Sequence, residues 1–255
     1  MPYIGVSPPS AALTSSDITD NIITEAKMAD DAISLTELKA GTDGEVISWD
    51  ASGNPVAIGA GTSGHFLKSQ GAGSQPVFAA ASSDYVKIQT TTLGSGTAAW
   101  SVDGWIDDTT YKNYAIYVYN FSHADNGAWV YGRWNISGST HTGTDYSYTL
   151  AQAHSGGSID AQVSTSASYW RISTNSTTTS KSLSGQIILY DPTNTSFFHG
   201  HTQVFFGYDG ATNFISTAGG GVLRSTSALT GITFYSSSGG NITAGSTVTI
   251  YGIKG

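Results

Sequence analysis

The sequence His199-Gly200-His201 places two imidazoles two residues apart. In a β-strand alternate side chains face the same way, so both rings would point in one direction. Imidazole suits transition metals, and three copies of the chain around an axis would supply six nitrogens, enough for an octahedral ion. His199 and His201 are therefore a candidate metal site shared by three chains. The alternative is an exposed strand with two solvated histidines, and no other cofactor is expected.

Two further motifs have the outline of ligand-binding loops. Residues 59–64, Gly-Ala-Gly-Thr-Ser-Gly, have the spacing of a dinucleotide fingerprint, but that motif requires a strand before it and a helix after it. Pro55 lies just upstream, and the motif falls inside a structural repeat. Residues 50–54 begin like a calcium loop, yet Gly61 stands where that loop needs a glutamate. We expect a hairpin turn at residues 50–54 and no cofactor at either motif.

Paired carboxylates would be needed for glycan hydrolysis. From residue 83 onward the chain has nine Asp and no Glu, and Asp107-Asp108 is the only adjacent pair. This pattern gives no support to a retaining or inverting pair. We expect no enzymatic activity, with a glycan depolymerase as a less favoured alternative and a free carbohydrate-binding module as a further one.

The composition restricts the class of protein. Only 11% of the 255 residues are charged, against about 25% in an ordinary soluble domain. The net charge of −8 argues against nucleic-acid binding, which needs a basic surface. There is no cysteine, and no apolar run is long enough to insert into a membrane. The N-terminus has neither a basic region nor an apolar core, so we expect no export signal.

The first 82 residues differ from the rest. They carry nine acidic residues against three lysines, a net charge of −6. Thr24-Glu25-Ala26-Lys27 recurs as Thr36-Glu37-Leu38-Lys39. Apolar residues follow the spacing of one helical face: Ile18, Ile22, Ala26, Ala29 and Ile33. One or two short helices are therefore expected between about residues 17 and 40.

A second repeat follows, with a period of 20 to 21 residues. Gly41-Thr42-Asp43-Gly44 matches Gly61-Thr62-Ser63-Gly64, and each copy reads as a turn, a short strand, a Gly/Ser turn and a short strand. Isolated hairpins are marginally stable in water. We therefore expect this part of the chain to be ordered by copies of itself, as the stalk of a homotrimer.

From about residue 83 the pattern changes to short strands separated by turns such as Asp103-Gly104 and Asp209-Gly210. This pattern is typical of an antiparallel β-sandwich, jelly-roll-like in outline. Alternation within the strands predicts the inward residues to be Ile116, Val118, Ile187, Leu189, Ile232, Phe234, Val248 and Ile250. The fold class is therefore mainly β, with residues 1–16 as an N-terminal anchor, 17–82 as a repeat stalk with short helices and glycine-rich β repeats, and 83–255 as a C-terminal domain.

The repeats resemble those of bacteriophage fibres. The two Thr-Glu-x-Lys segments look like the amphipathic repeats of fibre stalks, and the repeat starting at Gly61 resembles the glycine-rich repeats that follow them. Residues 231–254 are similar to the C-terminal β domain of many marine phage fibre proteins, and the opening Pro2-Tyr3-Ile4-Gly5 is similar to their starts. The resemblance implies a trimeric virion fibre with an N-terminal anchor, a slender stalk and a distal β-sandwich head.

This resemblance gives the functional expectation. The chain would be a structural protein assembled in the host cytoplasm, docked on another virion protein through its N-terminus and exposed on the particle. As a tail fibre it would bind a host-surface glycan, and the alternative is a head fibre or capsid decoration. Loops vary freely on a rigid β scaffold, so the candidate receptor residues are aromatic and amide residues of turn-rich segments: Trp170, Phe198, Tyr208 and Asn213. The competing interpretation is that these residues fill the core or a trimer interface.

Overall fold

The computed structural model describes residues 12, 14–29, 32–33, 38–107, 109–125, 127–173, 182–209 and 213–255. It is mainly β and divides into two compact units, Met1–Ala81 and Ser82–Gly255. We call these the N-terminal and the C-terminal unit. The division falls one residue before the expected one between residues 82 and 83.

The N-terminal unit begins with single 3-10 turns where we expected short helices. They are η1 (Ser15–Asp17) and η2 (Glu25–Lys27), each of three residues. In η1 the backbone N–H of Thr14 donates to the Asp17 carboxylate at 2.7 Å, so the first turn is capped. Helices shorter than about 12–15 residues are marginal in water without tertiary packing, and neither turn contains a buried residue. The second Thr-Glu pair, at 36–37, lies outside the described residues.

Two antiparallel hairpins follow, as the second repeat predicted. Strand β1 (Val46–Trp49) pairs with β2 (Pro55–Ile58), and β3 (His65–Lys68) pairs with β4 (Val77–Ala80). Asp50 closes the first hairpin, because its Oδ1 accepts backbone N–H groups of Ser52 and Asn54 at 2.8 Å each. These hydrogen bonds, those from Asn54 above all, hold the pKa of Asp50 below its usual value. The segment that begins like a calcium loop is thus a hairpin turn.

The hairpins of the N-terminal unit have almost no core. Among the described residues of this unit, Ile58 alone is buried, at 8% exposure, while Ile47, Trp49, Phe66 and Leu67 are exposed. Each hairpin therefore has apolar side chains that the chain itself does not cover.

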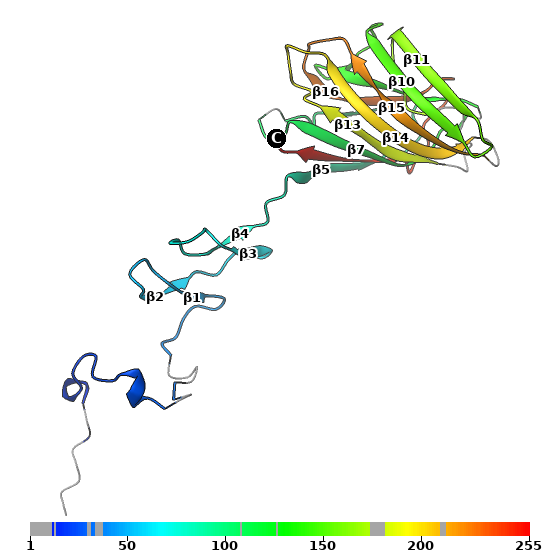
Figure 1. The fold of residues 1–255 in the computed structure, drawn as a ribbon. Coiled ribbons are helices and arrows are strands. Elements are labelled where there is room, and N and C mark those ends of the chain that lie inside the picture. Colours follow the sequence, from blue (N-terminus) through cyan, green and yellow to red (C-terminus); the bar gives the residue numbers. More distant parts are fainter. Residues whose placement is uncertain are drawn as a thin grey trace, which may run out of the picture. The chain divides into compact units, whose positions relative to one another are not determined.

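The C-terminal unit contains two antiparallel sheets (Figure 1). The large sheet has eight strands, in the order β11-β10-β15-β14-β13-β7-β17-β5. Along the chain these are β5 (Tyr85–Thr92), β7 (Asn113–Phe121), β10 (Tyr146–His154), β11 (Ile159–Ala167), β13 (Leu183–Tyr190), β14 (His199–Asp209), β15 (Asn213–Leu223) and β17 (Thr247–Ile253).

The small sheet has five strands, in the order β12-β8-β16-β6 with β9 paired to β8. They are β6 (Ala99–Asp103), β8 (Val130–Ile136), β9 (Ser139–Thr140), β12 (Trp170–Arg171) and β16 (Leu229–Ser236). None of the helical segments in the described part of the chain is long and apolar enough to cross a membrane.

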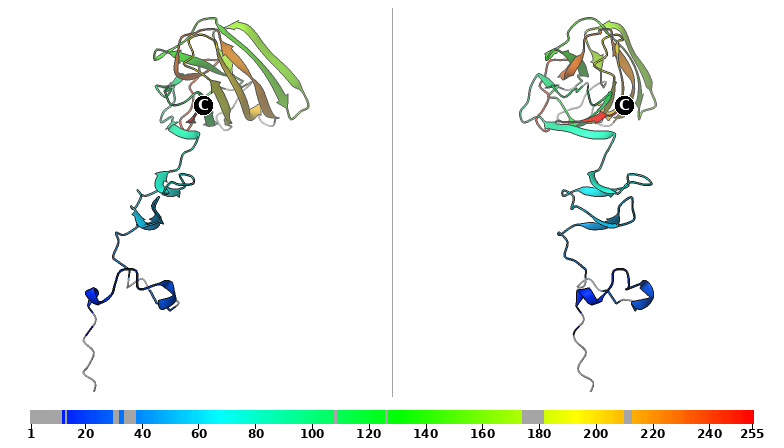
Figure 2. Two further views of the ribbon diagram at one scale, coloured as in Figure 1. Left: turned by 60° about the vertical axis from the view of Figure 1, so that its left-hand side comes forward. Right: turned by 90° about the vertical axis from the view of Figure 1, so that its left-hand side faces the viewer.

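One hydrophobic core joins the two sheets, and it confirms the predicted inward faces. All eight predicted residues are at most 1% exposed. Register explains this, because Ile116 of β7 lies opposite both Ile187 of β13 and Ile250 of β17. From the small sheet, Ile232 and Phe234 join the same cluster. The arrangement, seen from two sides in Figure 2, is that of two packed antiparallel layers, consistent with a β-sandwich. The eight strands of the large sheet and the five strands of the small sheet together outnumber the eight strands of a jelly roll.

Candidate functional site

The outer face of the large sheet carries exposed aromatic side chains. Because core residues occupy alternate positions, the residues between them point away from the small sheet. On β7 these are Tyr117 and Tyr119, and on β14 they include Val204 and Phe206, which is 51% exposed. Strand β13 lies between β7 and β14 and pairs with both. Strand pairing therefore places aromatic residues from distant parts of the sequence on one surface.

These residues line a groove of about 270 Å³. Gln186 lies in its middle, paired with Tyr117 on one side and Val204 on the other. The full lining is Tyr117, Tyr119, Ser184, Gly185, Gln186, Val204 and Phe206. The rings of Tyr117 and Tyr119 are nearly parallel, at 11° with their centroids 6.2 Å apart. The groove thus combines flat aromatic rings, an amide and a hydroxyl.

A tyrosine cluster continues the surface toward β17 and β5. Tyr251 lies with its ring centroid 5.7 Å from that of Tyr117 and 4.9 Å from that of Tyr85. The hydroxyl of Tyr85 donates to that of Tyr117 at 2.9 Å. Burial is the main cause that raises the pKa of Tyr85 well above its ordinary value, and the hydrogen bond to Tyr117 is the second cause. Burial also raises the pKa of Tyr119. These two phenols remain protonated and neutral at physiological pH.

The outer face is also without formal charge over its four central strands. The outward residues there are Asn113, Ala115, Tyr117 and Tyr119 on β7, Ser184, Gln186, Ile188 and Tyr190 on β13, Gly200, Thr202, Val204, Phe206 and Tyr208 on β14, and Phe214, Ser216, Ala218, Gly220 and Val222 on β15. None is acidic or basic. A neutral surface of aromatic, hydroxyl and amide groups can stack on and hydrogen-bond a neutral ligand, and it offers nothing to pair with an ionic one.

The predicted receptor residues do not lie together in the structure. Tyr208 lies on the outer face, with its ring 6.0 Å from that of Phe214. Phe198 is exposed just before β14. Asn213 begins β15 and its backbone pairs with Asp209, but its side chain lies outside what the structure describes.

Trp170 was expected at the surface, and this expectation is wrong. Its side chain is fully buried. Its ring stacks on that of Trp134 with centroids 4.7 Å apart, and its Nε1–H donates to Oε1 of Gln203 at 3.1 Å. Trp170 points inward because it occupies a core position of β12, opposite Gly132, where a Cβ would lie 2.3 Å from the indole. It has no ring face free for a sugar.

His199 and His201 do share one face of β14, as alternation predicted, but that face is the core. Both are buried, so neither the surface metal site nor the solvated pair is found. His199 donates through Nε2 to the Ser227 carbonyl at 2.8 Å. His201 lies against Trp134 and Trp170, with no hydrogen-bond partner in the described part of the chain, and burial lowers its pKa to about 3.

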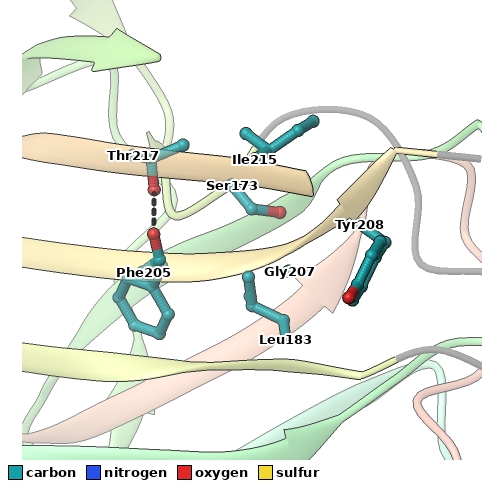
Figure 3. A pocket seen from close by; sticks show the side chains of 7 residues that line it. All are labelled: Ser173, Leu183, Phe205, Gly207, Tyr208, Ile215 and Thr217. Carbon is teal, nitrogen blue, oxygen red and sulfur yellow. Dashed lines mark hydrogen bonds between the residues drawn. The ribbon is translucent and has the colours of Figure 1, made fainter. Parts of the chain in front are cut away.

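A second hollow lies where β13, β14 and β15 approach one end of the sheet. Figure 3 shows Leu183, Phe205 and Tyr208 around it, with the Thr217 hydroxyl donating to the Phe205 carbonyl at 3.5 Å. Its volume of about 10 Å³ is roughly that needed for one water molecule. This hollow is a packing defect and not a ligand site.

The groove residues themselves were missed by sequence reasoning, which placed recognition on loops. Tyr117 and Tyr119 are each one residue from a predicted core position, Ile116 and Val118. The alternation that identified the core thus also predicts that these tyrosines face outward.

Among the described residues, no group of three or more histidine or acidic side chains could hold a metal ion. Comparisons with protein-family models, with curated proteins and with solved structures give no significant match.

Proposed function

We propose that this protein is a structural virion fibre protein that attaches to a neutral glycan on the host surface. The observation that carries the proposal is the uncharged groove of Tyr117, Tyr119, Gln186 and Phe206 on the outer face of the large sheet. Sugar rings stack on aromatic faces, and their hydroxyls pair with amide and hydroxyl groups. In this proposal residues 83–255 form a β-sandwich head that presents the groove.

The N-terminal unit supports the fibre part of the proposal. Its exposed Ile47, Trp49, Phe66 and Leu67 lie on hairpins that lack a core. A parallel homotrimer would cover such side chains with those of the neighbouring copies, as the resemblance to fibre stalks implies. Residues 1–16 would then dock on another virion protein, and the protein would be located on the particle.

Enzymatic activity is not part of the proposal. A general acid needs a raised pKa, whereas hydrogen bonds from Thr109 hold the pKa of Asp107 below its usual value. Asp108 lies outside the described residues. The competing role is a head fibre or capsid decoration, which would require no ligand in the groove.

The test is binding of the full-length protein to an array of neutral bacterial polysaccharides. Tyr119→Ala and Phe206→Ala should each weaken binding about tenfold or more while leaving the melting temperature unchanged. Phe197→Ala is the matched control, because Phe197 is an exposed aromatic residue outside the groove. If Phe197→Ala alone weakened binding, the site would lie elsewhere on the protein. Failure of the wild-type protein to bind any neutral glycan would favour a decoration role.

A further inference from the structure

The β12 edge of the small sheet brings two of the three arginines of the chain near one another. Strand register places Arg171 of β12 opposite Tyr131 of β8, and Arg133 is two residues from Tyr131 on the same face. Val130 and Trp134 of β8 belong to the core, so the alternate residues Tyr131 and Arg133 point outward. Arg171 lies at the β12 edge of the small sheet, where its guanidinium group donates to Gln162 of β11, a residue that pairs with core Leu150.

Aromatic rings hold both guanidinium groups in place. The Arg171 guanidinium carbon lies 3.5 Å from the ring centroid of Trp129, and that of Arg133 lies 4.5 Å from the ring centroid of Tyr235. Arg133 also donates through Nε to the Ser168 carbonyl at 2.7 Å. Such contacts orient a guanidinium group without neutralising its charge.

No carboxylate compensates these charges in the described part of the chain. Both ion pairs found there join a histidine to an aspartate, His141 to Asp145 and His154 to Asp160. Asp103, on the same sheet as Arg133, instead accepts hydrogen bonds from Asn135 and Thr230. Residues 174–181, which follow β12, contain no Asp or Glu. Within the described part of the chain, two positive charges thus have no acidic partner, although the net charge of the chain is −8.

The other contacts of Arg171 and its aromatic neighbours are with neutral groups, and Asp160, two residues from Gln162 on β11, pairs with His154. Arg171 donates to Oε1 of Gln162, and its Nε–H has no acceptor among the described residues. The rings of Tyr131 and Tyr169 stack between the arginines with centroids 3.9 Å apart and planes 11° apart. The result is a half-buried aromatic cluster, with Tyr131 itself only 7% exposed, flanked by two oriented guanidinium groups. Guanidinium groups are suited to bidentate contact with a planar or tetrahedral anion.

We propose that this surface, which we call the arginine face, binds an acidic sugar residue through its carboxylate or sulfate group. Arg133 and Arg171 would provide the charge and the hydrogen-bond donors. This inference goes beyond the proposed function, because it concerns residues outside the groove and an anionic ligand in place of a neutral one.

The experiment is calorimetric titration of the full-length protein with three probes: oligogalacturonate, dextran sulfate and uncharged dextran. We expect binding of at least one charged probe, weakening with added salt, and no effect from uncharged dextran at this face. Preference between the two charged probes identifies carboxylate or sulfate as the recognised group. Absence of binding to both charged probes would overturn the proposal.

Variants then locate the site. Arg133→Gln and Arg171→Gln should each weaken binding at least tenfold, and Arg171→Lys should weaken it several-fold, because lysine keeps the charge but lacks the planar fork. Arg224→Gln is the matched control, since it removes the same charge from an exposed arginine elsewhere. If Arg224→Gln weakened binding of the charged probe equally, binding would depend only on the net charge of the protein, and the proposed site would be wrong. If a Gln variant has a lowered melting temperature, Arg171→Lys decides the outcome. Phe206→Ala should leave this binding unchanged, which separates it from the groove.

Discussion

The hairpins of the N-terminal unit and the sheets of the C-terminal unit follow the same antiparallel pairing, but they differ in what covers their faces. In the C-terminal unit Ile116 and Phe234 come from different sheets and meet in one core. In the N-terminal unit the equivalent apolar positions, such as Trp49 at 63% exposure, have no second layer. The comparison shows that strand pairing alone gives local order, whereas burial between layers makes a unit stable by itself.

A buried charge should separate the two units most clearly. Ile116→Asp places an unpaired carboxylate in the core of the C-terminal unit, which should cost several kcal/mol, a large part of the stability of a typical domain. Ile47→Asp changes an exposed strand residue of the N-terminal unit and should leave melting of the C-terminal unit unchanged. Thermal unfolding followed by near-ultraviolet circular dichroism measures both. Equal melting temperatures for Ile116→Asp and wild type would contradict the strand register.

The buried histidines should make the C-terminal unit sensitive to acid. Burial lowers the pKa of His201 to about 3, below the unfolded value of ~6.5, so the unfolded chain binds the proton more readily. Stability is then fully present above pH ~6.5 and falls toward pH 3, by up to ~1.4 kcal/mol per pH unit from this residue. Burial also lowers the pKa values of His123 and His199. Denaturant unfolding at pH 7 and pH 4 should show a smaller difference for His201→Phe than for wild type, and an unchanged difference would exclude His201 as a source.

Removing an exposed apolar residue of the hairpins should weaken assembly and not the C-terminal unit. If copies of the chain cover Trp49, then Trp49→Ala removes burial of about 2–3 kcal/mol per chain. Light scattering should show a trimer for wild type. The variant should already dissociate at protein concentrations at which the wild type remains trimeric. A fragment of residues 82–255 should fold alone with native circular dichroism. A wild-type protein that is monomeric at all concentrations would contradict the trimer.

The smallest effect should come from the hairpin turn at Asp50. Asp50→Ala removes the acceptor of two backbone N–H groups, which should weaken that hairpin slightly. Amide exchange of β1 and β2 should quicken severalfold, and exchange in the C-terminal unit should not change. Asp20→Ala, an exposed acidic residue in the same unit, provides the control for the loss of charge. Faster exchange throughout both units would contradict their independence.

Sequence reasoning was accurate where structure is set by neighbouring residues. Alternation is a local property of a strand, and it correctly placed Ile187 and Leu189 inward. Turn chemistry also predicted the hairpin at Asp50. In the described part of residues 17–40 the expected helices are reduced to single 3-10 turns. The apolar spacing from Ile18 to Ile33 says nothing about a partner surface, and isolated turns do not lengthen without one.

The sequence by itself determined the β class, the division near residue 82 and which residues of each strand share a face. For β12 and β14, only the tertiary structure decided which face is covered. Trp170 and His201 are buried because the opposite sheet covers their side of β12 and β14, while Tyr119 and Phe206 are exposed because no other layer covers their side in the described part of the chain. The groove and the arginine face likewise depend on pairing between strands distant in sequence. Local periodicity cannot specify such long-range pairing, because any two strands of matching pattern could satisfy it.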